Sequence, residues 1–344
     1  MLRHRGLFLF RVPQYLGRVD WSRCQYAADM PVLNTDLQAL IDGMYGLELF
    51  NWEGLDAPAV RAKFAAIKVR SALAHVASVE DIEVSGTGGG VSCRFYHPHP
   101  GRRLPLLVWF HGGGWVLGDL DQEEATARRM ALCGDMAVLS VDYRLAPEHR
   151  FPCAFYDALS AWRWAIEHAE DLGCMEGGCG VGGGSAGGNL AAAVALMAVA
   201  DGGPVPAHQL LVYPVVDADF DRPSMLDFAE GPVLHRAHLQ WFWDQYVPEV
   251  GAREDWRAAP LRAPSHVGLP PATIVLAAHD PLVDEGLAYA AALRGAGVEV
   301  TCSVHAGLTH GFQGMAAKVP EALAIVEQMA AGVGAWLRGV ATGV

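Results

Sequence analysis

The chain has 344 residues, of which 52% are hydrophobic and 18% are charged, and its formal net charge is −13 at pH 7. This length suits one large catalytic domain with a modest insertion better than two independent domains. The negative charge repels phosphate backbones and argues against nucleic acid as a partner, and no uninterrupted apolar run is long enough for stable membrane insertion.

Residues 1–29 differ in character from the rest of the chain. Basic residues around the apolar stretch 7–10 loosely imitate a signal peptide, but Arg11 and Arg18 interrupt the imitation and no small-residue cleavage site follows. A more ordinary protein start begins at Met30, so we expect residues 1–29 to be a flexible extension or an upstream-translated segment. Seven scattered cysteines do not form an even disulfide framework, and the expected location is the cytoplasm.

The segment 30–80 precedes the whole predicted sheet and is expected to form cap helices. Apolar residues at helical spacing predict one helix from about Asp36 and a second from about Ala57 through Val69. Two short strands, Asp81–Val84 and Val91–Tyr96, flank a glycine-rich turn and predict a hairpin.

Short apolar runs then alternate with helical stretches, which is the pattern of repeated βαβ units and of an α/β fold. The uninterrupted apolar run Leu104–Phe110 indicates a strand buried on both faces, as in a parallel sheet covered by helices. We therefore expect residues 81–344 to form the catalytic domain, with an aromatic-rich cap insertion at about 217–262. The other expected strands are 136–141, 178–181, 209–213, 273–278 and 298–304, and the expected helices are 122–132, 154–170, 186–200, 284–293 and 320–337.

The strongest chemical signal is the segment Gly183–Gly187, which satisfies the pattern G-x-S-x-G between a predicted strand and a predicted helix. Such a turn is tight and strained, needs small residues on both sides of the serine, and presents the hydroxyl at the helix N-terminus. The alternative is an ordinary glycine-rich turn between a strand and a helix. We predict that Ser185 is a nucleophile.

The run His111-Gly112-Gly113-Gly114-Trp115 follows the predicted strand that ends at Phe110. Glycines allow a loop to turn its amides toward one point, where they stabilise the oxyanion of an acyl-transfer intermediate. We assign this role to the N–H groups of Gly113, Gly114 and Ala186. A phosphate-binding loop is the alternative, but no Lys-Ser/Thr pair follows.

A serine nucleophile needs a general base and an acid that orients the base, in the chain order Ser, Asp/Glu, His for this fold. Asp280 follows the predicted strand 273–278. Loops at the carboxyl ends of parallel strands are the ones that carry catalytic groups in such sheets, so we predict that Asp280 is the orienting acid. The nearby Asp284 and Glu285 suit the N-terminal dipole of the next helix, and capping is a sufficient role for them.

The predicted general base is His310, which lies between the last predicted strand and the final helix. His305 is the competing candidate, and the loop position favours His310. The pair Cys174 and Cys179 invites a metal site, but no second pair of His or Cys ligands lies nearby at zinc spacing, so we predict no metal.

In these motifs the chain resembles the hormone-sensitive-lipase-like family of bacterial esterases, also called family IV. The resemblance covers roughly residues 31–340. The segments that carry it are, in order, His111–Trp115, Asp142–Glu148, Gly183–Asn189, Asp280–Gly286 and His310–Phe312.

The resemblance implies an α/β-hydrolase fold, with an eight-stranded, mostly parallel sheet under a helical cap. It also implies hydrolysis of esters of short to medium acyl chains without a cofactor, and it allows a homodimer through an edge strand. The candidate residues for the substrate pocket are Trp115, Leu234, Trp241 and Phe242, although packing within the cap would explain them equally well.

Two further expectations concern single positions. Many relatives place Asp or Thr immediately before the serine, whereas this chain has Gly184, and we expect activity despite the difference. Arg144 and Glu148 are expected to pair with each other in a structural role beneath the active-site loops.

The sequence leaves two rival functions open. Plant hormone receptors of the same fold bind small molecules without catalysis, but they lose the histidine that this chain keeps at position 310. Amide or lactone hydrolysis would use the same three residues and the same oxyanion donors. Dehalogenases and epoxide hydrolases of this fold would need a carboxylate in place of Ser185.

Overall fold

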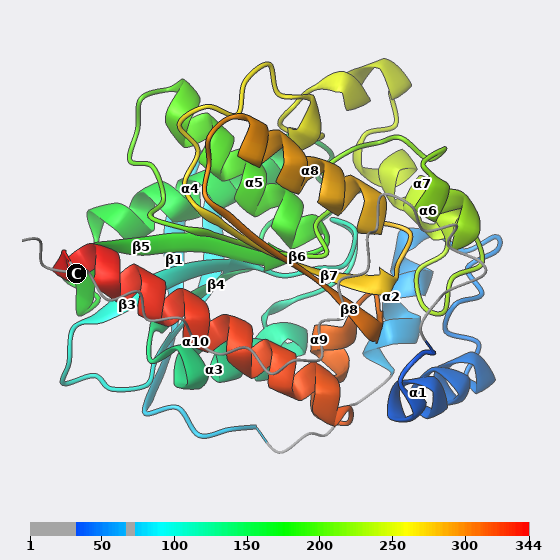
Figure 1. Ribbon diagram of the computed structural model, residues 1–344, viewed down its shortest axis with the longest axis horizontal. Helices are drawn as coiled ribbons and strands as arrows, with labels where there is room; N and C mark the ends of the chain where they lie inside the picture. Colours follow the sequence, from blue (N-terminus) through cyan, green and yellow to red (C-terminus); the bar gives the residue numbers. More distant parts are fainter. Residues whose placement is uncertain (1–31, 67–72, 344) are drawn as a thin grey trace, which may run out of the picture.

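Continuous apolar runs form the middle of the sheet. All seven residues of β3 (Leu104–Phe110) and all five of β4 (Ala137–Val141) are buried, because helices cover both faces of the sheet. In the computed structural model, which describes residues 32–66 and 73–343, eight strands lie in the order β1-β2-β4-β3-β5-β6-β7-β8 (Figure 1). The strand β2 is antiparallel to both of its neighbours, and the other pairs are parallel. The expected mostly parallel sheet is confirmed.

The first two strands form the predicted hairpin, and the other six strands, which are parallel to one another, lead toward the predicted site. The remaining strands are β1 (Ser78–Gly86), β2 (Gly89–His97), β5 (Cys174–Gly184), β6 (Gln209–Val212), β7 (Ala272–His279) and β8 (Val300–Thr309). The last strand continues five residues beyond the predicted end because its pairing with β7 resumes at His279 and Thr309 after an irregularity. His310 therefore follows the strand directly.

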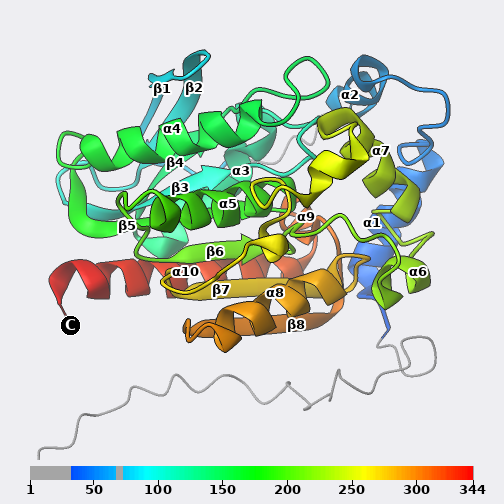
Figure 2. The ribbon, with the colours of Figure 1, turned by 90° about the horizontal axis from the view of Figure 1, so that it is seen from above.

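Two layers of helices enclose the sheet (Figures 1 and 2). One face carries α3 (Leu120–Gly134), the short α9 (Phe312–Met315) and α10 (Pro320–Thr342). The other face carries α4 (Cys153–Glu167), α5 (Ala186–Ala200) and α8 (Val283–Gly295). The helix α5 is apolar on nearly every side and almost entirely buried, which suits its place in the interior next to β5 and β6.

The two predicted cap segments meet at one end of the sheet (Figure 2). The hydroxyl of Tyr45 donates to the carbonyl of Gly231 at 3.2 Å, and His238 Nε2 donates to the carbonyl of Phe50 at 2.9 Å. These contacts join the N-terminal helices to the insertion. The elements concerned are α1 (Thr35–Gly46), α2 (Ala57–Ala65), α6 (Pro223–Asp227), α7 (Arg236–Tyr246), η1 (Val250–Glu254) and η2 (Pro260–Arg262).

The N-terminal part of the predicted cap adjoins two segments that lie outside the described residues. The second helix ends at Ala65, earlier than the predicted Val69, and residues 67–72 lie outside the described residues. The predicted extension 1–29 lies outside them as well. The division into cap and catalytic domain stays a prediction.

Within the two described ranges, no helix is both long and apolar enough to cross a membrane. The same ranges contain no group of three or more His, Cys, Asp or Glu side chains that could hold a metal ion. Cys174 and Cys179 lie buried in β5, where burial raises the pKa of both thiols.

The expected pairing of Arg144 with Glu148 is wrong. Arg144 instead makes a two-point ion pair with Asp157 of α4, with N–O distances of 2.8 and 2.7 Å. Glu148 makes a two-point pair with Arg61 of α2, at 2.7 Å for both contacts. The two side chains therefore tie their loop to different elements, one to the core and one to the cap.

Asp284 and Glu285 begin the next helix, as expected, and their acidic side chains suit its N-terminal dipole, although no side-chain hydrogen bond caps this helix at its N-cap residue. Both residues lie in the first turn of α8, but their carboxylates accept hydrogen bonds from other segments. Asp284 accepts from the N–H of Ser224 at 2.8 Å, and Glu285 accepts from the N–H of Val216 at 2.7 Å. They anchor the insertion onto the catalytic domain, because its loops end beside this helix.

Candidate active site

Ser185 occupies the sharp turn between β5 and α5. Its φ of +56° is a left-handed conformation that a non-glycine residue rarely adopts, so the turn is strained. The turn requires glycine on both sides. A Cβ at Gly183 would lie 2.3 Å from the carbonyl carbon of Gly187, and one at Gly187 would lie 1.9 Å from the carbonyl oxygen of Phe110. The G-x-S-x-G pattern thus reflects packing of three backbone segments.

The structure brings the three residues predicted as a catalytic triad into one hydrogen-bonded chain. His310 Nε2 lies 3.0 Å from Ser185 Oγ, and His310 Nδ1 lies 2.8 Å from Asp280 Oδ2. Because a carboxylate only accepts, Nδ1 carries the proton and Nε2 is left to accept from the serine hydroxyl. Asp280 is 1% exposed, and Ser185 and His310 are 8% and 9% exposed.

Two contacts hold the loops that carry Asp280 and His310. The second carboxylate oxygen of Asp280 accepts from the N–H of Leu282 at 2.9 Å. The hydroxyl of Thr309 donates to the carbonyl of His279 at 2.7 Å, which joins the end of β8 to the end of β7. The competing His305 lies within β8, where its Nε2 is 3.1 Å from Ser303 Oγ and burial lowers its pKa to about 4. It does not meet Ser185 in a hydrogen bond.

The glycine loop after β3 lies beside the serine. A Cβ at Gly112 would lie 3.7 Å from Ser185 Cβ. Gly113 has a φ of +109°, and its carbonyl accepts from the N–H groups of Val116 and Leu117, so its peptide is turned into a tight bend. Within the described part of the chain, the N–H groups of Gly113 and Gly114 have no protein acceptor. They are therefore available to a ligand.

The start of this loop is held by His111 and Tyr143. The Tyr143 hydroxyl donates to the His111 carbonyl at 2.8 Å, and the two rings stack at 4.2 Å. Burial lowers the pKa of His111 to about 4, so at neutral pH its Nδ1–H donates to the Gly112 carbonyl as part of an uncharged ring. The loop is thus fixed before any ligand arrives.

Comparison with known proteins agrees with this geometry. The sequence profile of the family described as the alpha/beta hydrolase fold matches residues 107–314. That range includes both glycine motifs, Asp280 and His310. This chain belongs to the α/β-hydrolase family.

Relatives of this α/β hydrolase also confirm the resemblance to the hormone-sensitive-lipase-like esterases. The carboxylic ester hydrolase LipN of Mycobacterium tuberculosis is 44% identical over 69% of this chain, a match that covers 65% of LipN, less than two thirds of its length. An ethyl acetate hydrolase of Pseudomonas putida is 37% identical over 68% of this chain and 75% of its own length. A solved ester hydrolase from the Lake Arreo metagenome is 35% identical with a TM-score of 0.84, and covers 88% of this chain and 99% of its own.

Of the residues predicted to line a substrate pocket, Phe242 is the one from the insertion that packs on the glycine loop of this α/β hydrolase. A Cβ at Gly114 would lie 2.2 Å from the Phe242 ring, so the ring packs directly on that glycine. Trp241 contacts Trp52 edge to face, with ring centroids 5.3 Å apart.

The other two candidates lie in different regions, Trp115 in the glycine loop itself and Leu234 in the insertion. Trp115 is 1% exposed and its ring stacks on Tyr246 at 4.3 Å. Leu234 is 7% exposed, in the loop before α7. Their part in substrate binding stays a prediction.

Three residues around the site were missed at the level of sequence. The ring of Tyr213 lies 4.5 Å from that of His310, and burial raises its pKa well above the ordinary value. Glu123 and Gln313 form a hydrogen bond behind the serine turn. Two positions in the sequence could have pointed to this region: Tyr213 directly follows β6, and Gln313 comes three residues after His310. Their partners could not be predicted, because they come from distant parts of the chain.

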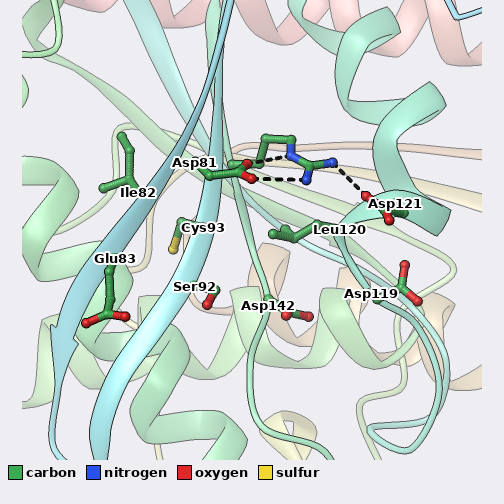
Figure 3. A pocket seen from close by; sticks show the side chains of 10 residues that line it. Asp81, Ile82, Glu83, Ser92, Cys93, Asp119, Leu120, Asp121 and Asp142 are labelled. Atoms are coloured by element: carbon green, nitrogen blue, oxygen red, sulfur yellow. Dashed lines mark hydrogen bonds and ion pairs between the residues drawn. The ribbon is translucent and has the colours of Figure 1, made fainter.

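A separate pocket of about 460 Å³ lies between the β1–β2 hairpin and the start of α3 (Figure 3). Arg94 spans it and pairs with Asp81 at 2.6 Å and with Asp121 at 2.8 Å. Its lining residues include none of the predicted site residues. The pocket is therefore distinct from the Ser185 site, and Arg94 already balances part of its negative charge.

Proposed function

We propose that this α/β hydrolase is a serine carboxylesterase that cleaves esters of short to medium acyl chains through an acyl-enzyme. One observation carries the proposal: the continuous hydrogen-bonded chain from Ser185 Oγ through His310 to Asp280, with distances of 3.0 and 2.8 Å. This order and spacing suit a nucleophile, a general base and an orienting acid. The relatives named as ester hydrolases support the same reaction class.

In the proposed reaction, His310 Nε2 takes the hydroxyl proton as Ser185 Oγ bonds to the ester carbonyl carbon. The tetrahedral intermediate collapses, the alcohol leaves with the proton returned by His310, and the acyl group stays on Ser185. Water then attacks the acyl carbon with His310 again as base, which releases the acid and restores the serine. Asp280 keeps the imidazole in the tautomer that accepts at Nε2 and stabilises its cation.

The oxyanion donors in this proposal are the N–H groups of Gly113, Gly114 and Ala186. Support comes from the amides of the two glycines, which have no backbone acceptor among the described residues, from the position of the loop beside Ser185, and from Ala186 at the first turn of α5. Removing one such donor typically costs about 3 kcal/mol of transition-state stabilisation. The reaction requires no metal or cofactor at this site.

The preference for short to medium acyl chains is supported by the crowded loop. The Phe242 ring packs on Gly114, and Trp52 and Trp241 back that ring with centroid distances of 5.2 and 5.4 Å. Bulky rings beside the oxyanion donors leave little length for an acyl or alcohol chain.

The test is hydrolysis of p-nitrophenyl esters from acetyl to palmitoyl by the wild type and by Ser185→Ala, in chelator-treated buffer. We expect the highest kcat/KM on short chains and loss of activity in Ser185→Ala. Activity that survives in Ser185→Ala contradicts the nucleophile. Absence of wild-type activity on every ester contradicts the esterase function and directs the search to amides, lactones or ligand binding.

A further inference from the structure

A polar network lies behind the Ser185 turn and takes no part in the proposed reaction. Glu123 is in the first turn of α3, and Gln313 is in α9, three residues after His310. Gln313 Nε2 and the indole N–H of Trp109 both donate to Glu123 Oε1, each at 2.9 Å. One carboxylate oxygen therefore joins β3, α3 and the segment that carries His310.

The other end of the Gln313 carboxamide faces the serine turn. A methyl group added at Gly184 would lie 2.9 Å from Gln313 Oε1, so the carboxamide occupies the space that a side chain at that position would need. Gln313 is 8% exposed, and its Oε1 is buried without a hydrogen-bond partner among the described residues. Leaving an acceptor unpaired is unfavourable, so the orientation of this amide is set by its bond to Glu123.

The charge of Glu123 also reaches the residues around His310. Part of the Glu123 residue remains accessible, but its carboxyl is buried. Burial raises the pKa of this carboxyl to about 7 and outweighs the hydrogen bonds from Trp109, Thr126 and Gln313, which lower it. The charge of Glu123 contributes to the raised pKa values of two nearby tyrosines, Tyr143 and Tyr213. Burial first, and then neighbouring charges including Glu123, raise the pKa of both well above the ordinary value.

We propose that Glu123 and Gln313 are positioning residues of the reaction, because together they hold the His310 segment against the Gly184 backbone and so set the distance between His310 and Ser185. This inference rests on the proposed esterase function. It also accounts for a glycine before the nucleophile, since the carboxamide of Gln313 fills the position from another part of the chain.

The proposal has a consequence for pH dependence. An ionised Glu123 accepts strongly from both Gln313 and Trp109, whereas the protonated acid is a weaker acceptor. Glutamine has nearly the shape of the protonated acid. The variant Glu123→Gln therefore mimics the wild type at low pH and differs from it where Glu123 is ionised.

The experiment measures kcat and KM of wild type and Glu123→Gln on p-nitrophenyl butyrate between pH 5.5 and 8.5. We expect the ratio of wild-type to variant kcat to rise from about one below pH 6 to about tenfold above pH 8, with KM within about twofold. A purely structural role of Glu123 predicts a ratio that does not change with pH.

Two further variants complete the test. Glu124→Gln is the matched control, because it removes the adjacent carboxylate of α3, which pairs with Arg128, and should leave the ratio near one throughout. Gln313→Met keeps the length of the side chain without the amide, and should lower kcat most above pH 8. This variant decides the question alone if Glu123→Gln fails to fold, as judged by its thermal midpoint.

The outcomes separate the two proposals. A pH-independent ratio for Glu123→Gln, or an unchanged kcat in Gln313→Met, overturns the positioning role while Ser185→Ala is inactive in the same assay. Activity in Ser185→Ala overturns the proposed function itself.

Discussion

The predicted site at the strand ends and the cap above it are built in different ways. Ser185 and the glycine loop are held by close backbone packing, since a Cβ at Gly187 would lie only 1.9 Å from the carbonyl oxygen of Phe110. They also lie where the strands end at one edge of the sheet. The cap is held mainly by rings, such as Trp52 on His238 at 4.0 Å, and by isolated hydrogen bonds such as His238 to Phe50. The predicted site is therefore preorganised by the fold, whereas the cap is a side-chain assembly that substitutions can remodel.

The largest effect is expected within the site. Asp280→Asn should lower kcat by about 10⁴-fold, because the asparagine amide no longer holds the imidazole in the productive tautomer. Steady-state kinetics on p-nitrophenyl acetate would measure this loss. Asp284→Asn, in the first turn of the helix that follows Asp280, is the control, since Asp284 holds the Ser224 backbone, and it should keep kcat within about tenfold. Near wild-type turnover in Asp280→Asn would remove Asp280 from the mechanism.

A smaller effect is expected where the two regions touch. Phe242→Ala removes the ring that packs on Gly114, and should raise kcat/KM for octanoyl over acetyl esters by about tenfold relative to the wild type. Leu239→Ala, which shortens another buried side chain of α7, is the control for general loosening of the cap. An equal change in both variants would mean that Phe242 has no specific role in chain-length selection.

The smallest effect is expected in the cap itself. Burial, and then the neighbouring His235, lower the pKa of His238 to about 4 from an ordinary value of 6.5. Between these values the unfolded chain binds more protons than the folded one, so the free energy of unfolding falls as the pH drops from 7 toward 4. The variant His238→Gln, whose amide can still donate to Phe50, should lose about 2 to 4 °C less in thermal midpoint between pH 7 and pH 5 than the wild type.

The exposed His149→Gln is the control for this measurement and should follow the wild type at both pH values. A His238→Gln variant with the same pH dependence as the wild type would mean that His238 does not couple cap stability to pH. The activity of His238→Gln at pH 8 should be close to that of the wild type, because the ring is neutral there in both the folded and the unfolded chain.

Much of the fold and of the candidate site was accessible from sequence because the signals are local. The run Leu104–Phe110 predicted its strand to the residue, and the helix after Ser185 was predicted with its observed bounds. The spacing of glycines around Ser185 and in the loop after Phe110 reflects clashes that any side chain would cause. Short-range constraints of this kind leave a pattern in consecutive letters.

The pairings between distant segments were decided only by the tertiary structure. The pairing of Arg144 and Glu148 was predicted from their proximity in sequence, yet each bonds to a helix from elsewhere in the chain. Glu123 and Gln313 lie 190 positions apart and meet only because α3 and α9 cover the same face of the sheet. Long polar side chains choose partners by the packing of layers, and a single sequence carries no record of which layers meet. The sequence by itself therefore determined the fold class and the residues proposed for the candidate site, and the tertiary structure decided what supports that site.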